Sequence, residues 1–455
     1  MPIVAHRTSV APSELHGEEN AKRLDSLLHG HWAVNAQFCS GPQSRISVLR
    51  QEAVVGAQNT SRIEGIGTST VAKKIPRTAK SRRPKNSGLR IRAALSLFSG
   101  AGGMDIGVME AGFSIVACLE FDPHCCETLR AAAAREERPT QVIENDIRLV
   151  DPKGLMTQLR LRPGELDLLC GGPPCQAFSQ IGKQEALSDE RGLLLFQMIR
   201  FAKVFKPKSI LIEQVKGLLT AKDERGRRGK VFERLLAELE DLGYVPKWKV
   251  VNAADYGVPQ LRKRVFVVAT RKPNGFEFPL PTHAPPDNTL GLFAAPAYRT
   301  VGEVIEGLPL PTEKNGKGKD CCHIDVTPAG DRFRIGGVPE GEYLSAQTHL
   351  PKEQRRNLTI KDTTKFLRLS RTRPANTLRC GEIFFHPTED RYLTPREYLR
   401  IHGYPDSYIL RGPIRGRSGR VRALDQHRQV ANSVPPPVAK LLARGIKKVL
   451  DAQDI

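Results

Sequence analysis

Short apolar runs alternate with amphipathic stretches from residue 93 to residue 270 of this chain. We expect the apolar runs to form buried strands at 93–98, 113–120, 166–170, 209–213, 248–253 and 264–270. We expect helices between them, among others at 123–134, 192–205 and 230–242. Because this alternation is typical of parallel strands covered by helices on both faces, the sequence predicts an α/β fold with a Rossmann-like, doubly wound sheet.

The alternation stops on both sides of this segment. Residues 1–92 lack sustained periodicity, and we expect a largely disordered basic extension there, with one short helix near 18–29. Residues 93–271 then form the α/β domain. Beyond it the chain is rich in Pro and Gly, so residues 272–390 predict a second, smaller and irregular domain. Helical patterns return in residues 391–455.

The formal net charge of the chain is +21 at pH 7. This excess predicts a polyanionic partner such as nucleic acid, although a basic protein with no particular partner would also carry it. Basic residues gather at 73–92, 352–379 and 411–428. The first cluster is either a solvated linker or a non-specific phosphate clamp.

Neither a membrane span nor a signal peptide is visible in the sequence. No apolar run approaches the ~18–20 residues needed to cross a bilayer, and the N-terminus lacks an apolar core followed by a cleavage site. The nine cysteines are scattered and contain no C-x-x-C pair, so we expect neither a disulfide framework nor a metal site. These features predict a cytoplasmic protein with no membrane partner.

A glycine-rich turn, FSGAGG at 98–103, follows the first expected strand and opens a helix. Glycines let the backbone turn tightly there, and the start of the helix offers free N–H groups to a ligand. Glu120 ends the strand 113–120, where a carboxylate reaches ribose hydroxyls, and Asp146, after a further strand that precedes 166–170, is placed to hold an adenine amino group. Asp105 stands where a dinucleotide site has its third glycine, so the predicted cofactor contains adenosine but need not contain a pyrophosphate.

A second motif, GGPPCQ at 171–176, directly follows the strand 166–170. Ligand sites of open α/β sheets lie beyond the carboxyl ends of the strands, so Cys175 is a candidate nucleophile, whereas most single cysteines are small core residues. Glu213 ends the strand 209–213, and we expect its carboxyl either to exchange a proton in the site or to cap the next helix.

Gln260, Arg262 and Arg264 lead into the strand 264–270. Side chains alternate along a strand, so these three share one face. Two guanidinium groups and an amide on one face are suited to gripping a carbonyl or a phosphate, and the alternative is a solvated edge strand.

Taken in order, FSGAGG, a strand-end Glu, PPCQ, EQV, QLRKR and QVANSV resemble the motifs of the DNA (cytosine-5) methyltransferase family. The resemblance covers about residues 93–270 and 366–446. It implies a class I methyltransferase fold, S-adenosyl-L-methionine as cofactor and double-stranded DNA as partner. By the same resemblance, residues 93–271 are the catalytic and cofactor-binding domain, 272–390 the target-recognition domain, and 391–455 a segment that completes the catalytic domain.

The resemblance also assigns roles to single residues. The cofactor-binding residues that it implies are Phe98, Gly100, Gly103, Glu120, Asp146, Pro174, Asn432, Ser433 and Val434. The catalytic residues that it implies are the nucleophile Cys175, the ring-binding carboxyl of Glu213, and Arg262 and Arg264, which support the target base and the nucleophile. Arg368, Pro374 and Thr377 match a motif that organises the target-recognition region.

The expected chemistry needs no metal. A thiolate that adds at carbon 6 of cytosine turns the ring into an enamine, and carbon 5 of this enamine can attack a methyl sulfonium. Neither carbon is accessible inside a duplex, so the base must be flipped out at a cost of a few kcal/mol.

Two departures from the family pattern occur near these motifs. Gln214 stands where the family has an Asn that supports the active-site loop, and Ala431 replaces a Gly near the cofactor edge. We therefore keep two alternatives, a tRNA cytosine-5 methyltransferase and a catalytically silent DNA-binding paralogue. We expect a monomer, with a cognate restriction endonuclease, where there is one, acting separately.

Overall fold

The computed structural model describes residues 91–174, 193–271, 275–286, 295–313, 321–347, 349–355, 366–415 and 423–452. The chain divides into two compact units, Met1–Pro84 and Lys85–Ile455, and all described residues belong to the second. The expected N-terminal extension, its short helix near 18–29 and nearly all of the basic cluster at 73–92 lie outside the described residues.

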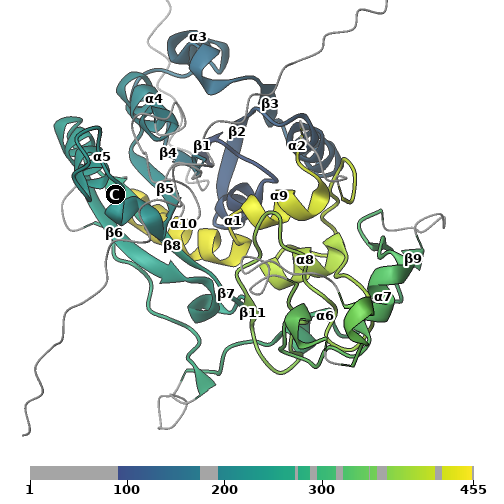
Figure 1. Cartoon of the computed structure of the whole chain (residues 1–455). Coiled ribbons are helices and arrows are strands. Elements are labelled where there is room, and N and C mark those ends of the chain that lie inside the picture. Colours follow the sequence, from purple (N-terminus) through teal and green to yellow (C-terminus); the bar gives the residue numbers. More distant parts are fainter. Residues whose placement is uncertain are drawn as a thin grey trace, which may run out of the picture. The chain divides into compact units, whose positions relative to one another are not determined.

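A seven-stranded sheet with the order β3-β2-β1-β4-β5-β8-β6 forms the centre of the fold (Figure 1). Its strands are β1 (Arg92–Leu97), β2 (Phe113–Glu120), β3 (Gln141–Glu144), β4 (Leu168–Gly171), β5 (Ser209–Val215), β6 (Val245–Asn252) and β8 (Lys263–Thr270). The strand order reverses between β1 and β4, which pair in parallel. The predicted doubly wound α/β fold is therefore confirmed.

One strand runs against the expected parallel direction. β8 is antiparallel to both of its neighbours, β5 and β6. Parallel strands need a crossover connection of about a dozen residues or more, usually a helix. Between β6 and β8 the chain forms only a 3-10 turn at Ala253–Tyr256 and the two-residue strand β7 (Gln260–Leu261), so β8 returns beside β6 as in a hairpin.

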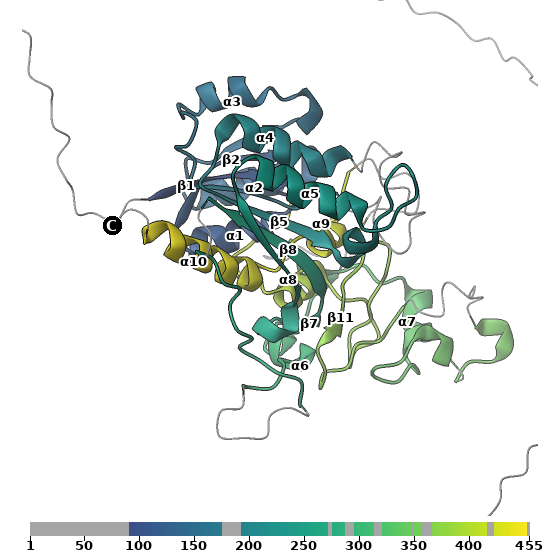
Figure 2. The same ribbon diagram turned by 90° about the vertical axis from the view of Figure 1, so that its left-hand side faces the viewer.

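Helices cover both faces of the sheet (Figure 2). On one face α3 (Pro152–Gln158), α4 (Gln197–Phe205) and α5 (Lys230–Asp241) pack over Leu95 and Leu97 of β1. On the other face α1 (Gly103–Glu110) and α10 (Pro436–Asp451) pack over Ala94. α2 (Pro123–Arg135) follows β2 and begins with Asp122, whose carboxylate accepts a hydrogen bond from the backbone N–H of Cys125. Alternate residues of β1 thus enter two separate cores, as expected for a sheet buried on both sides.

Short elements replace this pattern after β8. They are α6 (Val301–Ile305), β9 (Thr312–Glu313), β10 (Ile324–Asp325), α7 (Ala329–Ile335) and β11 (Ala375–Asn376), followed by α8 (Pro395–His402) and α9 (Gln426–Asn432). The guanidinium group of Arg368 fixes this region: it donates to the carbonyls of Ile335, Val338, His386 and Pro387 and pairs with Asp390. Thr377 donates to the carbonyl of Leu261 in β7, which joins the region to the sheet. Within the described part of the chain, no helix has the length and apolar character needed to cross a membrane.

A cluster of ion pairs lies at the end of the sheet where β1 begins, and its central residue, Arg92, is buried. Arg92, which is 2% exposed, pairs with Asp167 before β4 and with Asp451 at the end of α10, at 3.1 and 2.7 Å. Lys208 also contacts Asp167, and Lys447 contacts Asp451, at 2.7 and 2.6 Å. Because the cluster joins β1, β4, β5 and α10, we expect it to contribute strongly to stability.

The substitution Arg92→Met tests this cluster. It leaves the buried Asp167 carboxylate with fewer partners, and removing one member of a buried pair typically costs about 3–5 kcal/mol. We expect a loss of that order in the free energy of unfolding, measured with urea. Arg130→Met is the control, because Arg130 and Glu144 form an exposed pair whose loss should cost less than about 1 kcal/mol. Equal effects of the two substitutions would contradict the prediction.

Candidate active site

The predicted site residues follow strands whose carboxyl ends lie at one edge of the sheet. Leu97 of β1 pairs with Leu119 of β2 and with Gly171 of β4, and Gly171 pairs with Ile212 of β5. The residues that come next on these strands are therefore neighbours along the same edge. They are Phe98, Glu120, Gly172 and Glu213.

The glycine-rich turn after β1 has a strongly bent backbone. Phe98, Gly100 and Gly102 have φ values of 55°, 53° and 72°, in the left-handed region that favours glycine. A Cβ placed on Gly100 would meet no atom within 4 Å, so open space lies in front of this residue. The turn thus exposes backbone next to the start of α1, as an approaching ligand requires.

Asp105 explains why the turn departs from the dinucleotide spacing. Its buried carboxyl accepts hydrogen bonds from Ser96 Oγ at 2.5 Å and from Cys118 Sγ at 3.2 Å. Burial raises the pKa of Asp105, because it disfavours the ionised form. Where a dinucleotide site has a glycine, this chain therefore has an internal anchor that ties α1 to β1 and β2.

Glu120 links the end of β2 to the glycine-rich turn. Its Oε2 accepts from the backbone N–H of Gly100 at 2.7 Å, and its Oε1 accepts from those of Phe121 and Asp122 at 2.8 Å. Burial raises the pKa of Glu120, and the three N–H donors oppose this shift. A carboxylate offers about four acceptor sites, so these bonds are compatible with a further donor from a ligand.

Asp146 lies at the same edge after β3, but Arg148 occupies much of its carboxylate. The Arg148 guanidinium bonds both carboxylate oxygens at 2.7–3.1 Å and lowers the pKa of Asp146. Sequence reasoning missed two neighbours, Phe121 and Leu149, which are 69% and 77% exposed. Large apolar side chains close after the acids Glu120 and Asp146 were the available signal, since a bound ligand could cover them.

Glu213 lies under the turn that leads to Cys175. The residue is 8% exposed, and its carboxyl pairs with Arg264 Nε at 3.0 Å. A Cβ on Gly172 would lie 3.3 Å from Glu213 Oε2, so the turn passes close to this carboxyl. Burial raises the pKa of Glu213, while the guanidinium groups of Arg264 and Arg262 oppose the shift. Cys175 itself lies outside the described residues, and the preceding Pro174 is exposed.

Gln214 supports this turn directly. Its side chain is buried, Nε2 donates to the carbonyl of Pro173 at 2.9 Å, and Oε1 accepts from the backbone N–H of Val215 at 3.1 Å. The amide that replaces the family's Asn thus reaches the turn in spite of its extra methylene.

Arg262 and Arg264 contact different groups. Arg264 pairs with Glu213, whereas Arg262, which is 2% exposed, donates to the carbonyls of Leu378 and Ser433 at 3.3 and 3.0 Å. The expected alternation is present, since Gln260 and Arg262 are buried and the residues between and after them are exposed. The strand is nevertheless interrupted at Arg262, because β7 pairs with β11 and β8 with the large sheet.

The late segment around residues 432–434 reaches the glycine-rich turn. A Cβ on Gly103 would lie 2.2 Å from the carbonyl oxygen of Val434 and 3.2 Å from Ser433 Cβ. Only glycine fits at this contact. Asn432 is exposed, and its Oδ1 accepts a bond from Cys380 Sγ at 2.8 Å. The first and the last of the predicted motifs therefore pack against each other, although they lie at opposite ends of the described chain.

Residues 93–448 match the model of the family described as C-5 cytosine-specific DNA methylase. The chain belongs to this family. The methylase is 32% identical over 364 residues to the type II methyltransferase M.NgoMIV of Neisseria gonorrhoeae, which covers 79% of this chain and 99% of the relative. It is 40% identical over 230 residues to the type II methyltransferase M.AquIA of Picosynechococcus sp., which covers 48% of this chain and 89% of that protein.

A solved structure with the same fold is a prophage-encoded DNA modification methyltransferase of Escherichia coli. Its TM-score is 0.57 at 22% sequence identity, with 79% of this chain and 99% of that chain covered. The resemblance predicted from the motifs is confirmed, and the methylase is a DNA cytosine-5 methyltransferase.

Gln214→Ala tests the support of the turn. The substitution leaves the Pro173 carbonyl without this donor inside the protein, which typically costs about 1–3 kcal/mol. We expect a loss of that order in thermal denaturation and a slower methyl transfer, because the turn is released. Gln158→Ala is the control, since Gln158 bonds Gln141 on the surface and should change stability by less than about 0.5 kcal/mol. Wild-type behaviour of Gln214→Ala would refute the supporting role.

Proposed function

We propose that the methylase transfers a methyl group from S-adenosyl-L-methionine to carbon 5 of a flipped-out cytosine in a specific DNA sequence, through a covalent adduct with Cys175. The observation that carries this proposal is the buried Glu213–Arg264 pair, 3.0 Å apart, under the turn that leads into Cys175. The proposed nucleophile, Cys175 after β4, and the proposed proton donor, Glu213 in the adjacent strand β5, would thus act on the same cytosine ring.

The residues at the carboxyl ends of β1, β2 and β3 suit the proposed cofactor. Gly100 faces open space, Glu120 offers an acceptor for ribose hydroxyls, and the exposed ring of Phe121 offers an apolar contact for a base. Asp146 can accept from an adenine amino group if Arg148 shares its carboxylate. When bound, S-adenosyl-L-methionine supplies the methyl group. Gly103, with Ser433 and Val434 packed on it, would shape the site rather than contact the ligand through a side chain.

Cys175 and Glu213 have different roles in the proposed reaction: Cys175 is the nucleophile and Glu213 the proton donor to the cytosine ring. The Cys175 thiolate forms a bond to carbon 6, and the displaced electron pair makes carbon 5 nucleophilic. A protonated Glu213 donates to ring nitrogen 3 and accepts from the exocyclic amine, which stabilises the altered ring. After methylation, carbon 5 loses its proton to a base, and the carbon 6–sulfur bond breaks to regenerate the thiolate. Arg264 Nε, 3.0 Å from Glu213 Oε1, would hold the carboxyl in place by a hydrogen bond that forms with either protonation state.

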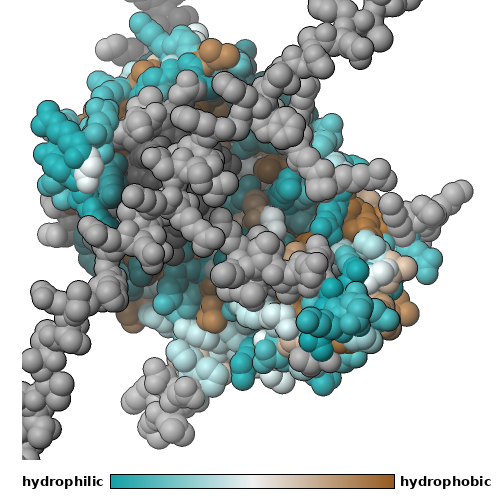
Figure 3. All heavy atoms as spheres, in the orientation of Figure 1, coloured by the Kyte–Doolittle hydropathy of each residue, from teal (hydrophilic) through white to brown (hydrophobic). Residues whose placement is uncertain are grey.

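The proposed substrate is double-stranded DNA with the target base extruded. The described residues that are visible in Figure 3 are mostly hydrophilic, with apolar side chains in small patches. The net charge of +21 favours a polyanion as partner. We propose residues 272–390 as the target-recognition domain, organised by Arg368, and residues 391–455 as the segment that completes the catalytic domain. Since several relatives are named type II methyltransferases, we also propose a role in restriction–modification, as a monomer acting separately from any endonuclease.

Cys175→Ser tests the covalent mechanism. With radiolabelled S-adenosyl-L-methionine, we expect the wild-type protein to label unmethylated phage DNA and the variant to bind this DNA without labelling it. A duplex containing 5-fluorocytosine should trap the wild type covalently. Release of the enzyme requires a base to remove the hydrogen at carbon 5 as a proton, and fluorine in its place cannot be removed in this way. Cys39→Ser is the matched control and should behave as the wild type.

Three outcomes would contradict the proposal. Full activity of Cys175→Ser would refute the nucleophile. Label that appears only in tRNA would favour the tRNA methyltransferase. A wild-type protein that binds DNA but forms neither label nor adduct would favour the silent paralogue.

Arg264→Met tests the protonation of Glu213. A carboxyl that must donate a proton loses its function as pH rises through its pKa, so methyl transfer should decline on the alkaline side. The Arg264 guanidinium favours the ionised form, and its removal should raise the pKa of Glu213 further. We therefore expect a slower enzyme whose alkaline decline begins at higher pH, measured as a pH–rate profile. Arg264→Lys keeps the charge and should move the decline less, and an unmoved decline in Arg264→Met would refute this assignment.

A further inference from the structure

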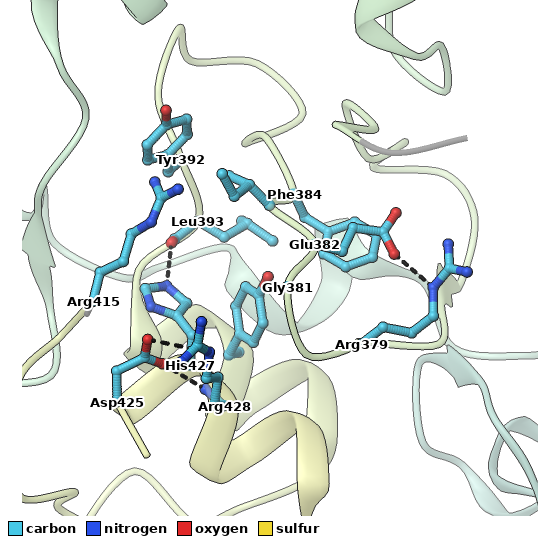
Figure 4. A pocket seen from close by; sticks show the side chains of 12 residues that line it. Arg379, Gly381, Glu382, Phe384, Tyr392, Leu393, Arg415, Asp425, His427 and Arg428 are labelled. Atoms are coloured by element: carbon cyan, nitrogen blue, oxygen red, sulfur yellow. Dashed lines mark hydrogen bonds and ion pairs between the residues drawn. The ribbon is translucent and has the colours of Figure 1, made fainter. Parts of the chain in front are cut away.

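A hollow lies outside the Glu213 site and is lined by residues from 379–384, from 392–398, by Arg415 and by residues from 425–428. Its volume is about 170 Å³. Figure 4 shows Arg415 beside Tyr392 on one side of the hollow, Arg379 beside Glu382 on the other, and Arg428 projecting from α9. The three arginines thus line one hollow from three separate segments.

The charge of the lining is positive. Arg379 pairs with Glu382 at 2.6 Å, Arg428 pairs with Asp425 at 3.6 Å, and Arg415 stacks over the ring of Tyr392 at 4.9 Å. Three guanidinium groups therefore face two carboxylates. A guanidinium has five N–H donors, so one ion pair does not exhaust its bonding capacity.

His427 links two of the segments that line the hollow. Its ring nitrogens lie 2.8 Å from the carbonyl oxygens of Ile414 and Leu393. Tyr398 packs edge-on against its ring at 4.7 Å. His427 thus holds the segment at Ile414 against the segment at Leu393.

We propose that this hollow binds a backbone phosphate of the DNA substrate. Guanidinium groups match the oxygens of a phosphodiester in geometry and charge, and they do so without reading the base sequence. This inference rests on the proposed function, because that function supplies the polyanion.

Residues that line the hollow are connected by hydrogen bonds to residues of the proposed active site. Arg379 directly follows Leu378, whose carbonyl accepts a bond from Arg262. Arg428 lies in α9 together with Asn432, whose side chain bonds Cys380. Two of the segments that line the hollow are thus held by Arg262 and by the segment around Asn432. A phosphate held there would set the position of the duplex relative to the strand ends.

The test is the salt dependence of DNA binding by the full chain. The probe is a 30-base-pair duplex of mixed sequence, and the variants are Arg379→Gln, Arg415→Gln and Arg428→Gln. Loss of one phosphate contact should reduce the slope of log K against log salt by about 1. Arg379→Lys should restore the slope, since a phosphate accepts a point charge. In methyl transfer to phage DNA, the KM for DNA should rise more than kcat falls.

Arg271→Gln is the matched control. Arg271 is also exposed and also stacks on a tyrosine, Tyr244 at 4.4 Å, but it follows β8 at the opposite edge of the sheet. It should keep the wild-type slope and rate. Circular dichroism and thermal denaturation establish that each variant is folded.

Two results would overturn the inference: slopes equal to that of the control in all three folded variants, or a changed methylation sequence with an unchanged slope, which would indicate base reading. The proposed function fails separately. A wild-type protein that binds the duplex with the expected slopes but transfers no methyl group to DNA would refute the function and still support the phosphate site.

Discussion

The buried guanidinium group of Arg262 joins the three parts of the chain on which the functional edge depends. It leads into β8, donates to the carbonyl of Leu378 beside β11, and donates to that of Ser433 before α10. His402 also contacts the Ser433 carbonyl, and Gln260 bonds both His402 and the backbone N–H of Leu378. Because buried carbonyls without donors are costly, these bonds select one arrangement of the three segments. The position of the Glu213–Arg264 pair depends on this arrangement.

Local rules explain why much of the fold and the site could be predicted from sequence. The periodicity of 93–270 defined the strands, and the rule that ligands meet the carboxyl ends of strands selected Glu120 and Glu213. The reversed direction of β8 was missed, because periodicity locates a strand without giving its direction. The signal was the stretch between β6 and β8, which contains no helix-length pattern and is too short for a crossover.

Side-chain partners were harder to predict, because they come from residues far apart in sequence. Alternation placed Arg262 on the same face as Arg264, but their separate partners, Leu378 and Ser433 against Glu213, depend on how the late loops return. The sequence showed that Asp105 breaks the dinucleotide spacing of glycines. Only the structure shows that Asp105 is an anchor, because its hydrogen bond from the Ser96 hydroxyl depends on the fold. In the same way, Gln214 was visible as a departure from the family's Asn, whereas its hydrogen bond to the Pro173 carbonyl depends on how the folded chain brings the two residues together.

The packing of α1 on α10 has a consequence for how the protein is made. A Cβ on Gly107 would lie 2.4 Å from the carbonyl oxygen of Pro436, so the two helices are in backbone contact, and the Arg92–Asp451 bond next to them spans 359 residues of chain. During synthesis one face of the sheet stays uncovered until α10 has left the ribosome. The glycine-rich turn and its late partner, Val434, also meet only then. A nascent chain therefore cannot bring the glycine-rich turn together with Val434, or α1 together with α10, before these late residues have left the ribosome.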